Sequence, residues 1–254
     1  MSGRVQAGPG EHSDNREQSA PGKHRDRPYT TLFLLMSVDG KISTGSTDEL
    51  DVDSDFPLIP GLKEGLAQYY DIEQTTDLWS LVSGRVQAKL GANTKPLPAK
   101  TPVSFALIDS SHLTAEGVRY FCAKSRECVL ITQNRTHPAF GLKEPNLHII
   151  LQETRLLSPA LAALKAETGC QRLTLQTGGS LNGQLLREKL IDAVDIVVAP
   201  VLVGGKDTPT LIDGPSLACR EELSKLGVLR LTDCRALKNS YLRLRYQVLP
   251  GFSL

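Results

Sequence analysis

Short apolar runs that alternate with helical patterns constrain the fold of this chain more than any other feature of its sequence. The first run, Tyr29–Val38, is aromatic, β-branched and leucine-rich, and it ends in the turn signal Asp39-Gly40. Further strands are predicted at Lys41–Thr44, Asp77–Val82, Val103–Asp109, Glu127–Gln133, Asn146–Gln152, Arg172–Thr177 and Asp195–Val203. Because strands that alternate with helices form largely parallel sheets covered on both faces, the sequence predicts an α/β fold.

Helical segments and a terminal hairpin complete the expected domain. Apolar residues recur at helical spacing in residues 62–72, and a short helix is predicted after Ser83. A longer helix is predicted at Ser158–Thr168, with Ser158 as its N-cap and Gly169 just past its end. Two alternating runs flank Lys238-Asn239 and predict an antiparallel hairpin. We therefore expect a mixed, mostly parallel sheet in a single domain.

The composition sets the limits of that domain and excludes several classes of protein. Residues 1–27 are rich in Gly, Pro, Ser and mixed charges, so we predict a disordered tail, followed by one domain over residues 28–254. The net charge of +1 argues against a nucleic-acid-binding protein that relies on phosphate neutralisation. Apolar stretches are too short to span a membrane and none follows Met1, so we expect a cytoplasmic protein with no membrane partner.

The five cysteines and five histidines show no spacing typical of a metal site or of a disulfide framework. We expect no metal, and we interpret the cysteines as small buried hydrophobic residues. No histidine is assigned a catalytic role. The hexapeptide SGRVQA occurs at residues 2–7 and again at 83–88, a recurrence for which the sequence offers no physical reason.

The adjacent glycines Gly178-Gly179 stand between the predicted strand at 172–177 and the helix that follows it. In open α/β sheets, ligands bind beyond the carboxyl ends of the strands, where N–H groups at helix N-termini face the crevice. Two glycines would let the backbone come close to a bulky anion such as a pyrophosphate. A tight turn that needs positive φ is the alternative explanation, and the pair alone is not a dinucleotide fingerprint.

The segment from Gln176 to Gly214 resembles the signature of the riboflavin-biosynthesis reductase family, whose fold is similar to that of dihydrofolate reductase. In that family a GG pair and an LNG triplet precede a helix, a turn, a strand ending in Ala-Pro and a second GG loop. The matching residues are Gly178-Gly179, Leu181-Asn182-Gly183, Ile191-Asp192, Ala199-Pro200 and Gly204-Gly205. The amino-terminal S-x-D-G-K mark of the family is matched within Met36–Ile42, and its closing strand by Ser240–Val248.

The resemblance implies an NADPH-dependent reductase, usually a homodimer. The usual substrate is a ribosylamino-pyrimidine phosphate, which is reduced by hydride transfer at the ribose C1′ in riboflavin biosynthesis. Arg85 would pair with the 2′-phosphate that distinguishes NADPH from NADH. The cofactor-binding residues that the resemblance implies are Leu35, Ser83, Gly84, Arg85, Gln87, Gly178, Gly179, Ser180, Leu181 and Asn182.

The resemblance also implies which residues lie near the reacting carbon. Asp39 and Lys41 are the candidate catalytic residues: Asp39 would orient or protonate the substrate, and Lys41 would meet a phosphate or stabilise developing negative charge. Ser37 and Thr177 are the candidate substrate-binding residues.

Four features depart from the family pattern. Gln87 stands where the family usually has Thr, and Thr177 stands where many members have a Glu that could supply charge or transfer a proton. Residues 46–57 replace a segment that normally faces the substrate, and the paired zinc deaminase of many members has no H-x-E and P-C-x-x-C motifs here. Two alternatives therefore stay open: a reductase of a different imine or carbonyl compound, and a non-catalytic dinucleotide-binding relative.

Overall fold

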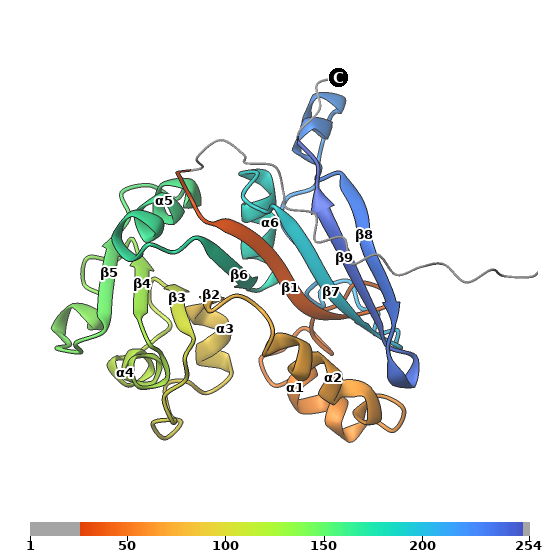
Figure 1. Ribbon diagram of the computed structural model, residues 1–254, viewed down its shortest axis with the longest axis horizontal. Helices are drawn as coiled ribbons and strands as arrows, with labels where there is room; N and C mark the ends of the chain where they lie inside the picture. The colour runs from red at the N-terminus through yellow and green to blue at the C-terminus, as the bar shows by residue number, and fades with distance from the viewer. Residues whose placement is uncertain (1–25, 251–254) are drawn as a thin grey trace, which may run out of the picture.

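Nine strands form one mixed sheet in the computed structural model, which describes residues 26–250 (Figure 1). Their order across the sheet is β5-β4-β3-β2-β6-β1-β7-β9-β8. All neighbours from β5 to β7 are parallel, whereas β9 is antiparallel to both β7 and β8. The strands are β1 Tyr29–Ser37, β2 Trp79–Ser83, β3 Ser104–Ile108, β4 Cys128–Thr132, β5 Leu147–Leu151, β6 Arg172–Gln176, β7 Ala193–Ala199, β8 Leu229–Ala236 and β9 Leu242–Val248.

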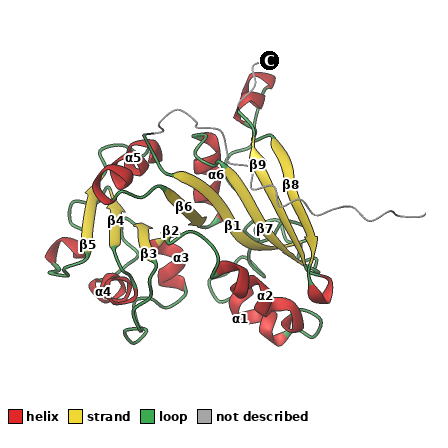
Figure 2. Ribbon diagram, in the orientation of Figure 1, coloured by secondary structure: helices red, strands yellow, loops and turns green. Residues whose placement is uncertain are grey.

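Helices cover both faces of the sheet, and Figure 2 shows α5 and α6 on one side of it and α1 to α4 on the other. The α-helices are α1 Val52–Asp55, α2 Lys63–Glu73, α3 Gly84–Lys89, α4 Ala115–Lys124, α5 Leu157–Thr168 and α6 Gly179–Arg187. Short 3-10 helices are η1 Phe56–Leu58, η2 Pro138–Gly141, η3 Arg220–Lys225 and η4 Lys238–Ser240. The α/β fold with a mostly parallel sheet and an antiparallel terminal hairpin is therefore confirmed.

The hydrophobic core differs between the two faces of the sheet. On the α5–α6 face, one continuous cluster includes Leu81 and Leu161. On the opposite face the core is divided: Phe121 of α4 belongs to one cluster, and Phe33 and Leu66 belong to another beneath α1 and α2. Between these two clusters, over β2 and β6, the middle of that face carries polar side chains.

Several element boundaries differ from the sequence predictions for identifiable reasons. Residues 41–44 form no strand, because the chain turns back and makes one isolated bridge between Lys41 and Thr210. Strand β7 ends at Ala199, since Pro200 has no N–H to donate to a ladder. Helix α5 begins at Leu157 rather than after an N-cap at Ser158.

The start of α5 is fixed by a contact that the local sequence does not contain. The carboxylate of Glu188, at the end of α6, accepts hydrogen bonds from the N–H groups of Leu157 and Ser158 at 2.8 and 3.1 Å. A side chain from another helix thus replaces the predicted serine cap. Helices α1 and α4 were not predicted, although Thr114 caps α4 by accepting from the N–H of Gly117 at 3.3 Å.

The predicted tail lies almost entirely outside the described residues, as does the first SGRVQA copy. Its last residue, Arg27, is bound to the domain through the carboxylate of Asp192. Cys122, Cys128 and Cys170 are buried as predicted, whereas Cys219 and Cys234 are exposed. Within residues 26–250, no helix is both long and apolar enough to cross a bilayer, and no cluster of His, Cys, Asp and Glu is suited to a metal.

Candidate active site

A cavity of about 290 Å³ opens at the carboxyl ends of β2 and β3, in front of the N-terminus of α6. It brings together two segments predicted to bind the cofactor, represented by Ser83 and Arg85 from one and by Ser180 and Leu181 from the other. The first N–H groups of α6 have no acceptor within the helix, so an anion there would meet free donors and a favourable dipole. The cavity is lined by Ser83, Arg85, Ile108, Asp109, Ser110, His112, Ser180, Leu181 and Gln184.

The glycines of α6 have a packing role that the sequence did not indicate. Gly178 has φ −77°, and Gly179 is not among the positive-φ residues, so the tight-turn explanation is wrong. A Cβ atom on Gly179 would lie 2.3 Å from the carbonyl oxygen of Thr210, and one on Gly183 would lie 1.8 Å from that of Asp213. These two glycines let residues 210–213 cross the helix closely.

The side chains of Thr177 and Asn182 are buried and bonded to each other. The Asn182 amide also donates to the carbonyl oxygens of Thr177 and Leu211, at 3.2 and 2.9 Å, and so ties β6 and α6 to the crossing segment. Leu35 lies in the core, 3% exposed. The predicted contacts of Leu35, Thr177 and Asn182 with cofactor or substrate stay predictions, because all three side chains are buried in this structure.

The two other predicted cofactor residues of the first segment, Gly84 and Gln87, differ in their surroundings. Gly84 is buried, and a Cβ atom there would lie 2.4 Å from that of Asp109, so glycine is needed for close packing. Gln87 belongs to α3 and is not among the residues that line the cavity. Their predicted contacts with the cofactor also stay predictions.

The predicted catalytic residues Asp39 and Lys41 both hold the loop at residues 203–208. The Asp39 carboxylate accepts from the Ser37 hydroxyl and from the N–H groups of Val203 and Gly204, at 3.1 and 2.6 Å. The bond from Ser37, followed by those two amides, lowers the pKa of Asp39 to about 2. Asp39 is thus ionised at neutral pH, which disfavours it as a proton donor and leaves the orienting role as a prediction.

Lys41 binds the same loop from its other end. Its ammonium group donates to the carbonyl oxygens of Gly205 and Thr208, at 2.7 and 3.0 Å. In these contacts the charged group of Lys41 binds neutral carbonyl oxygens and not a carboxylate. The predicted contact of Lys41 with a phosphate stays a prediction. Ser37, predicted to bind substrate, is buried: its hydroxyl donates to Asp39 and accepts from the N–H of Lys41.

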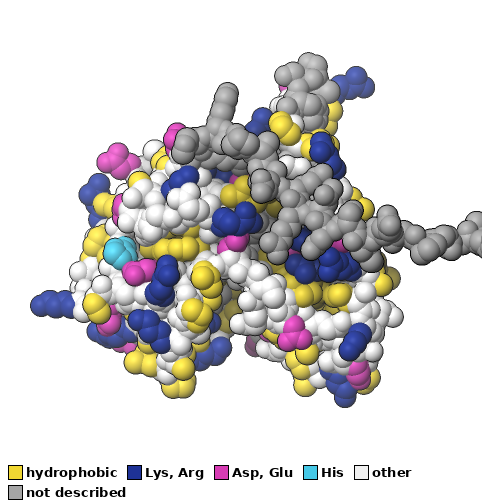
Figure 3. All heavy atoms as spheres, viewed as in Figure 1, with side chains coloured by type: hydrophobic (Ala, Val, Ile, Leu, Met, Phe, Trp, Pro, Cys, Tyr) yellow, Lys and Arg dark blue, Asp and Glu magenta, His cyan; other side chains and the backbone are white. Residues whose placement is uncertain are grey.

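A second group of polar side chains lies on the face between α1–α2 and α3–α4, where Figure 3 shows an indentation in the outline of the molecule. The Tyr70 hydroxyl donates to Asp53 at 2.8 Å, the Gln176 amide donates to Glu73, and the Ser80 hydroxyl donates to Gln176 at 2.7 Å. We call this set, Asp53, Tyr70, Glu73, Ser80 and Gln176, the acidic groove.

One carboxyl group of the acidic groove, that of Glu73, is suited to proton transfer. Burial raises the pKa of Glu73 above its ordinary value, against the opposing effect of its bond from Gln176. Asp53, the other carboxyl group of the set, is exposed. Gln176 is the last residue of β6 and is separated from Gly178 only by Thr177, so the acidic groove includes the end of the strand that leads into α6. Sequence reasoning did not identify this set.

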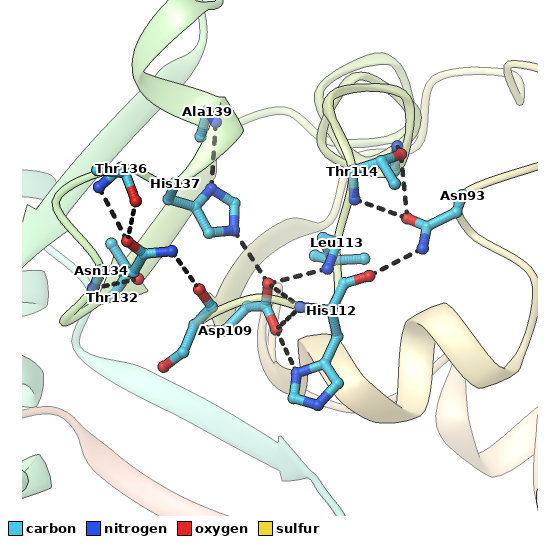
Figure 4. A network of polar contacts seen from close by, with 12 residues as sticks. Asn93, Asp109, His112, Leu113, Thr114, Thr132, Asn134, Thr136, His137 and Ala139 are labelled. Carbon is cyan, nitrogen blue, oxygen red and sulfur yellow. Dashed lines mark hydrogen bonds and ion pairs between the residues drawn. The ribbon is translucent and has the colours of Figure 1, made fainter.

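Sequence reasoning also missed a buried network behind the cavity, drawn in Figure 4. The carboxylate of Asp109 accepts from the N–H of Leu113 at 2.9 Å, from His137 Nε2 at 3.0 Å and from His112 Nδ1 at 3.0 Å. Burial alone would raise the pKa of Asp109, but the bonds from Leu113, His137 and His112 outweigh it and keep the pKa below its usual range. The sequence feature that could have revealed this network is Asp109, at the end of a predicted strand, followed three residues later by His112.

Comparisons with known proteins agree with this geometry. The model of the RibD C-terminal domain family matches residues 28–242. The chain is 29% identical over 198 residues to the 2,5-diamino-6-ribosylamino-4(3H)-pyrimidinone 5′-phosphate reductase of Methanothermobacter thermautotrophicus, covering 75% of this chain and 86% of that protein. It is 25% identical over 216 residues to the reductase of the same name from Archaeoglobus fulgidus, covering 79% of this chain and 94% of that protein.

Solved structures share the fold at lower identity. The RibD protein of Acinetobacter baumannii aligns with a TM-score of 0.60 and 15% identity over 89% of this chain, which spans only 59% of that protein. The riboflavin biosynthesis reductase of Saccharomyces cerevisiae aligns with a TM-score of 0.54 and 14% identity, over 89% of this chain and 92% of that one.

Proposed function

Since the chain belongs to the RibD C-terminal domain family, we propose that it is an NADPH-dependent reductase of 2,5-diamino-6-ribosylamino-4(3H)-pyrimidinone 5′-phosphate in riboflavin biosynthesis. One structural observation carries the cofactor assignment: Ser83 and Arg85, far from Ser180 in the sequence, line the same cavity at the N-terminus of α6. The names of the two archaeal relatives support the substrate. A cytoplasmic location stays a prediction.

The residues around the cavity fit a dinucleotide phosphate. The free amides of α6 would hold the pyrophosphate, and Arg85 would offer its planar fork of donors to a further phosphate. Arg85 is now 3.6 Å from Asp48, and both side chains are more than two-thirds exposed. An exposed ion pair of this kind stabilises a protein little, so Arg85 can exchange Asp48 for a phosphate at small cost.

We place the pyrimidine substrate in the acidic groove. In the ring-opened form of the substrate the C1′–O4′ bond is broken, the proton of the attached nitrogen has moved to O4′, and C1′ is an imine carbon. NADPH, when bound, would supply a hydride to that carbon, and the imine nitrogen must then gain a proton. Glu73, whose pKa is raised by burial, can hold that proton, and the Gln176 amide orients its carboxyl group. Lys124, at the end of α4, lies on the same face with its ammonium 5.1 Å from the Phe105 ring centroid, and offers positive charge to the substrate phosphate.

Nucleotide binding followed by turnover tests the proposal. We expect the purified protein to bind NADPH at least about tenfold more tightly than NADH, because a charge-assisted phosphate contact adds about 1.4 kcal/mol or more. Addition of the ribosylaminopyrimidine phosphate is then expected to consume NADPH, measured as loss of its near-ultraviolet absorbance. Binding without oxidation would favour the other substrate or the non-catalytic relative, and no binding of either nucleotide would refute the cofactor assignment.

We also propose that the protein is a homodimer built on the β8–β9 hairpin. The strand register places one row of apolar side chains on a single face of this hairpin. Leu229, Leu231 and Leu242 are between 39% and 53% exposed, although β8 forms the edge of the sheet. An exposed apolar edge favours pairing with another chain, and a second copy offers the same apolar surface.

Replacement of Leu231 by glutamate is expected to convert the dimer into a monomer, because it places a charge in the proposed interface. Sedimentation velocity would measure the change in mass. Leu58→Glu provides a matched control, since Leu58 is 77% exposed in η1, away from the hairpin. A wild-type protein that sediments as a monomer would refute the proposed dimer.

A further inference from the structure

The loop that follows β3 places a histidine in the wall of the nucleotide cavity. His112 lines the cavity together with Arg85, and its side chain is 48% exposed. Its Nδ1 atom lies 3.0 Å from the carboxylate of Asp109, which is buried beneath it (Figure 4). One edge of the imidazole ring is therefore fixed by the protein, and the other edge belongs to the exposed part of the side chain.

Asp109 is itself fixed by groups that only donate to it. The N–H groups of His112 and Leu113 contact its two oxygens, and His137 Nε2 lies 3.0 Å from Oδ2. His137 is 1% exposed, and its Nδ1 accepts from the N–H of Ala139 at 3.1 Å, so its Nε2 carries the proton. Asp109 is thus an ionised acceptor, and His112 Nδ1 must be the donor in their bond.

This tautomer determines what His112 offers to a ligand. With its Nδ1 proton directed at Asp109, His112 presents Nε2 to a ligand in the cavity. A phosphate monoester, whose own second pKa is about 6, can share a proton with that nitrogen in a charge-assisted bond. The charged groups around the ring are Asp109 from the end of β3 and Arg85 from α3, with His137 behind Asp109 and Asp48 paired to Arg85.

We propose that His112, held by Asp109 and His137, binds the 2′-phosphate of the dinucleotide together with Arg85 and so sets the preference for NADPH over NADH. The inference rests on the proposed function. The amides of α6 suit the singly charged pyrophosphate esters, whereas the phosphate monoester carries more negative charge and favours side-chain partners. Arg85 supplies a cation in the cavity wall, and the His112 ring lines the same wall. Asp109 and His137 are positioning residues.

Binding of NADPH and of NADH to His112→Gln, measured by titration calorimetry, tests this role. The Kd for NADPH is expected to rise about tenfold, because a charge-assisted bond is lost, while the Kd for NADH changes by less than about twofold. Asp109→Asn is expected to reduce the same preference, since the ring loses its anionic partner. His148→Gln is the matched control, because His148 is half exposed and paired with Glu127 at 3.1 Å but does not line the cavity.

The ratio of the two dissociation constants separates this role from a structural one. An equal loss of NADPH and NADH affinity in His112→Gln would mean that the ring only supports the loop, and would overturn the inference. A wild-type preference for NADPH that persists in His112→Gln would overturn it as well, with the proposed function intact. A wild-type protein that binds neither nucleotide would refute the proposed function, and the inference with it.

Discussion

Replacement of Glu73 by glutamine is expected to lower kcat for NADPH oxidation by about two orders of magnitude, the usual contribution of a positioned proton donor. Glutamine has nearly the same shape and can still bond to Gln176, so the groove is expected to keep its structure. Because Glu73 lies outside the nucleotide cavity, the Kd for NADPH should not change. Steady-state rates with both substrates saturating, together with NADPH titration, would measure the two quantities.

The pH dependence of kcat provides a second test of the role of Glu73. Burial raises the pKa of Glu73, and a proton donor works only while it is protonated, so kcat should fall as pH rises through that raised pKa. Glu73→Gln should lack this limb of the profile. Asp71→Asn is the matched control, because Asp71 is an exposed carboxylate on the same helix. An unchanged kcat and an unchanged pH limb in Glu73→Gln would exclude Glu73 as the proton donor.

The central parallel strands were predictable because both of their faces are largely buried. Strands such as β1 and β4 are then nearly continuous apolar runs, which differ clearly from the polar segments between them. Helix α4 was not predictable in the same way, since Gly117 disfavours a helix locally. A Cβ atom on Gly117 would lie 2.2 Å from the Asn93 side chain, so this glycine is needed by a contact from a distant loop.

The candidate site was predictable where it depends on topology. The carboxyl ends of neighbouring parallel strands meet at one edge of the sheet, which is why Arg85 and Ser180 line one cavity. The contact of Glu73 with Gln176 depends instead on how α2 packs on the sheet, which no periodicity in the sequence specifies. The same holds for Asp39, whose acceptor role depends on two amides of the loop that follows β7.

Replacement of Asp192 by alanine is expected to lower the free energy of unfolding by about 3 kcal/mol, the range for one removed partner of a buried ion pair. The Asp192 carboxylate is 8% exposed, accepts two bonds from Arg27 at 2.7 and 3.0 Å, and accepts from the N–H of Thr30 at 2.9 Å. Its loss leaves the Arg27 guanidinium without its anion and removes the side-chain bond to the N–H of Thr30 in the first strand. Thermal unfolding followed by circular dichroism would show a decrease in Tm of about 10 °C.

Two further variants separate the ion pair from its hydrogen bonds. Asp192→Asn keeps an oxygen for the N–H of Thr30 but removes the charge, so its loss should be intermediate. Asp77→Ala breaks a pair with Arg172 at 2.8 Å, and since the Arg172 side chain is 58% exposed, the loss should stay below about 1 kcal/mol. Wild-type stability of Asp192→Ala would mean that Arg27 belongs with the preceding tail. The expected loss would instead assign Arg27 to the folded domain and give Asp192, in the Ile191-Asp192 turn of the family signature, a role in stability.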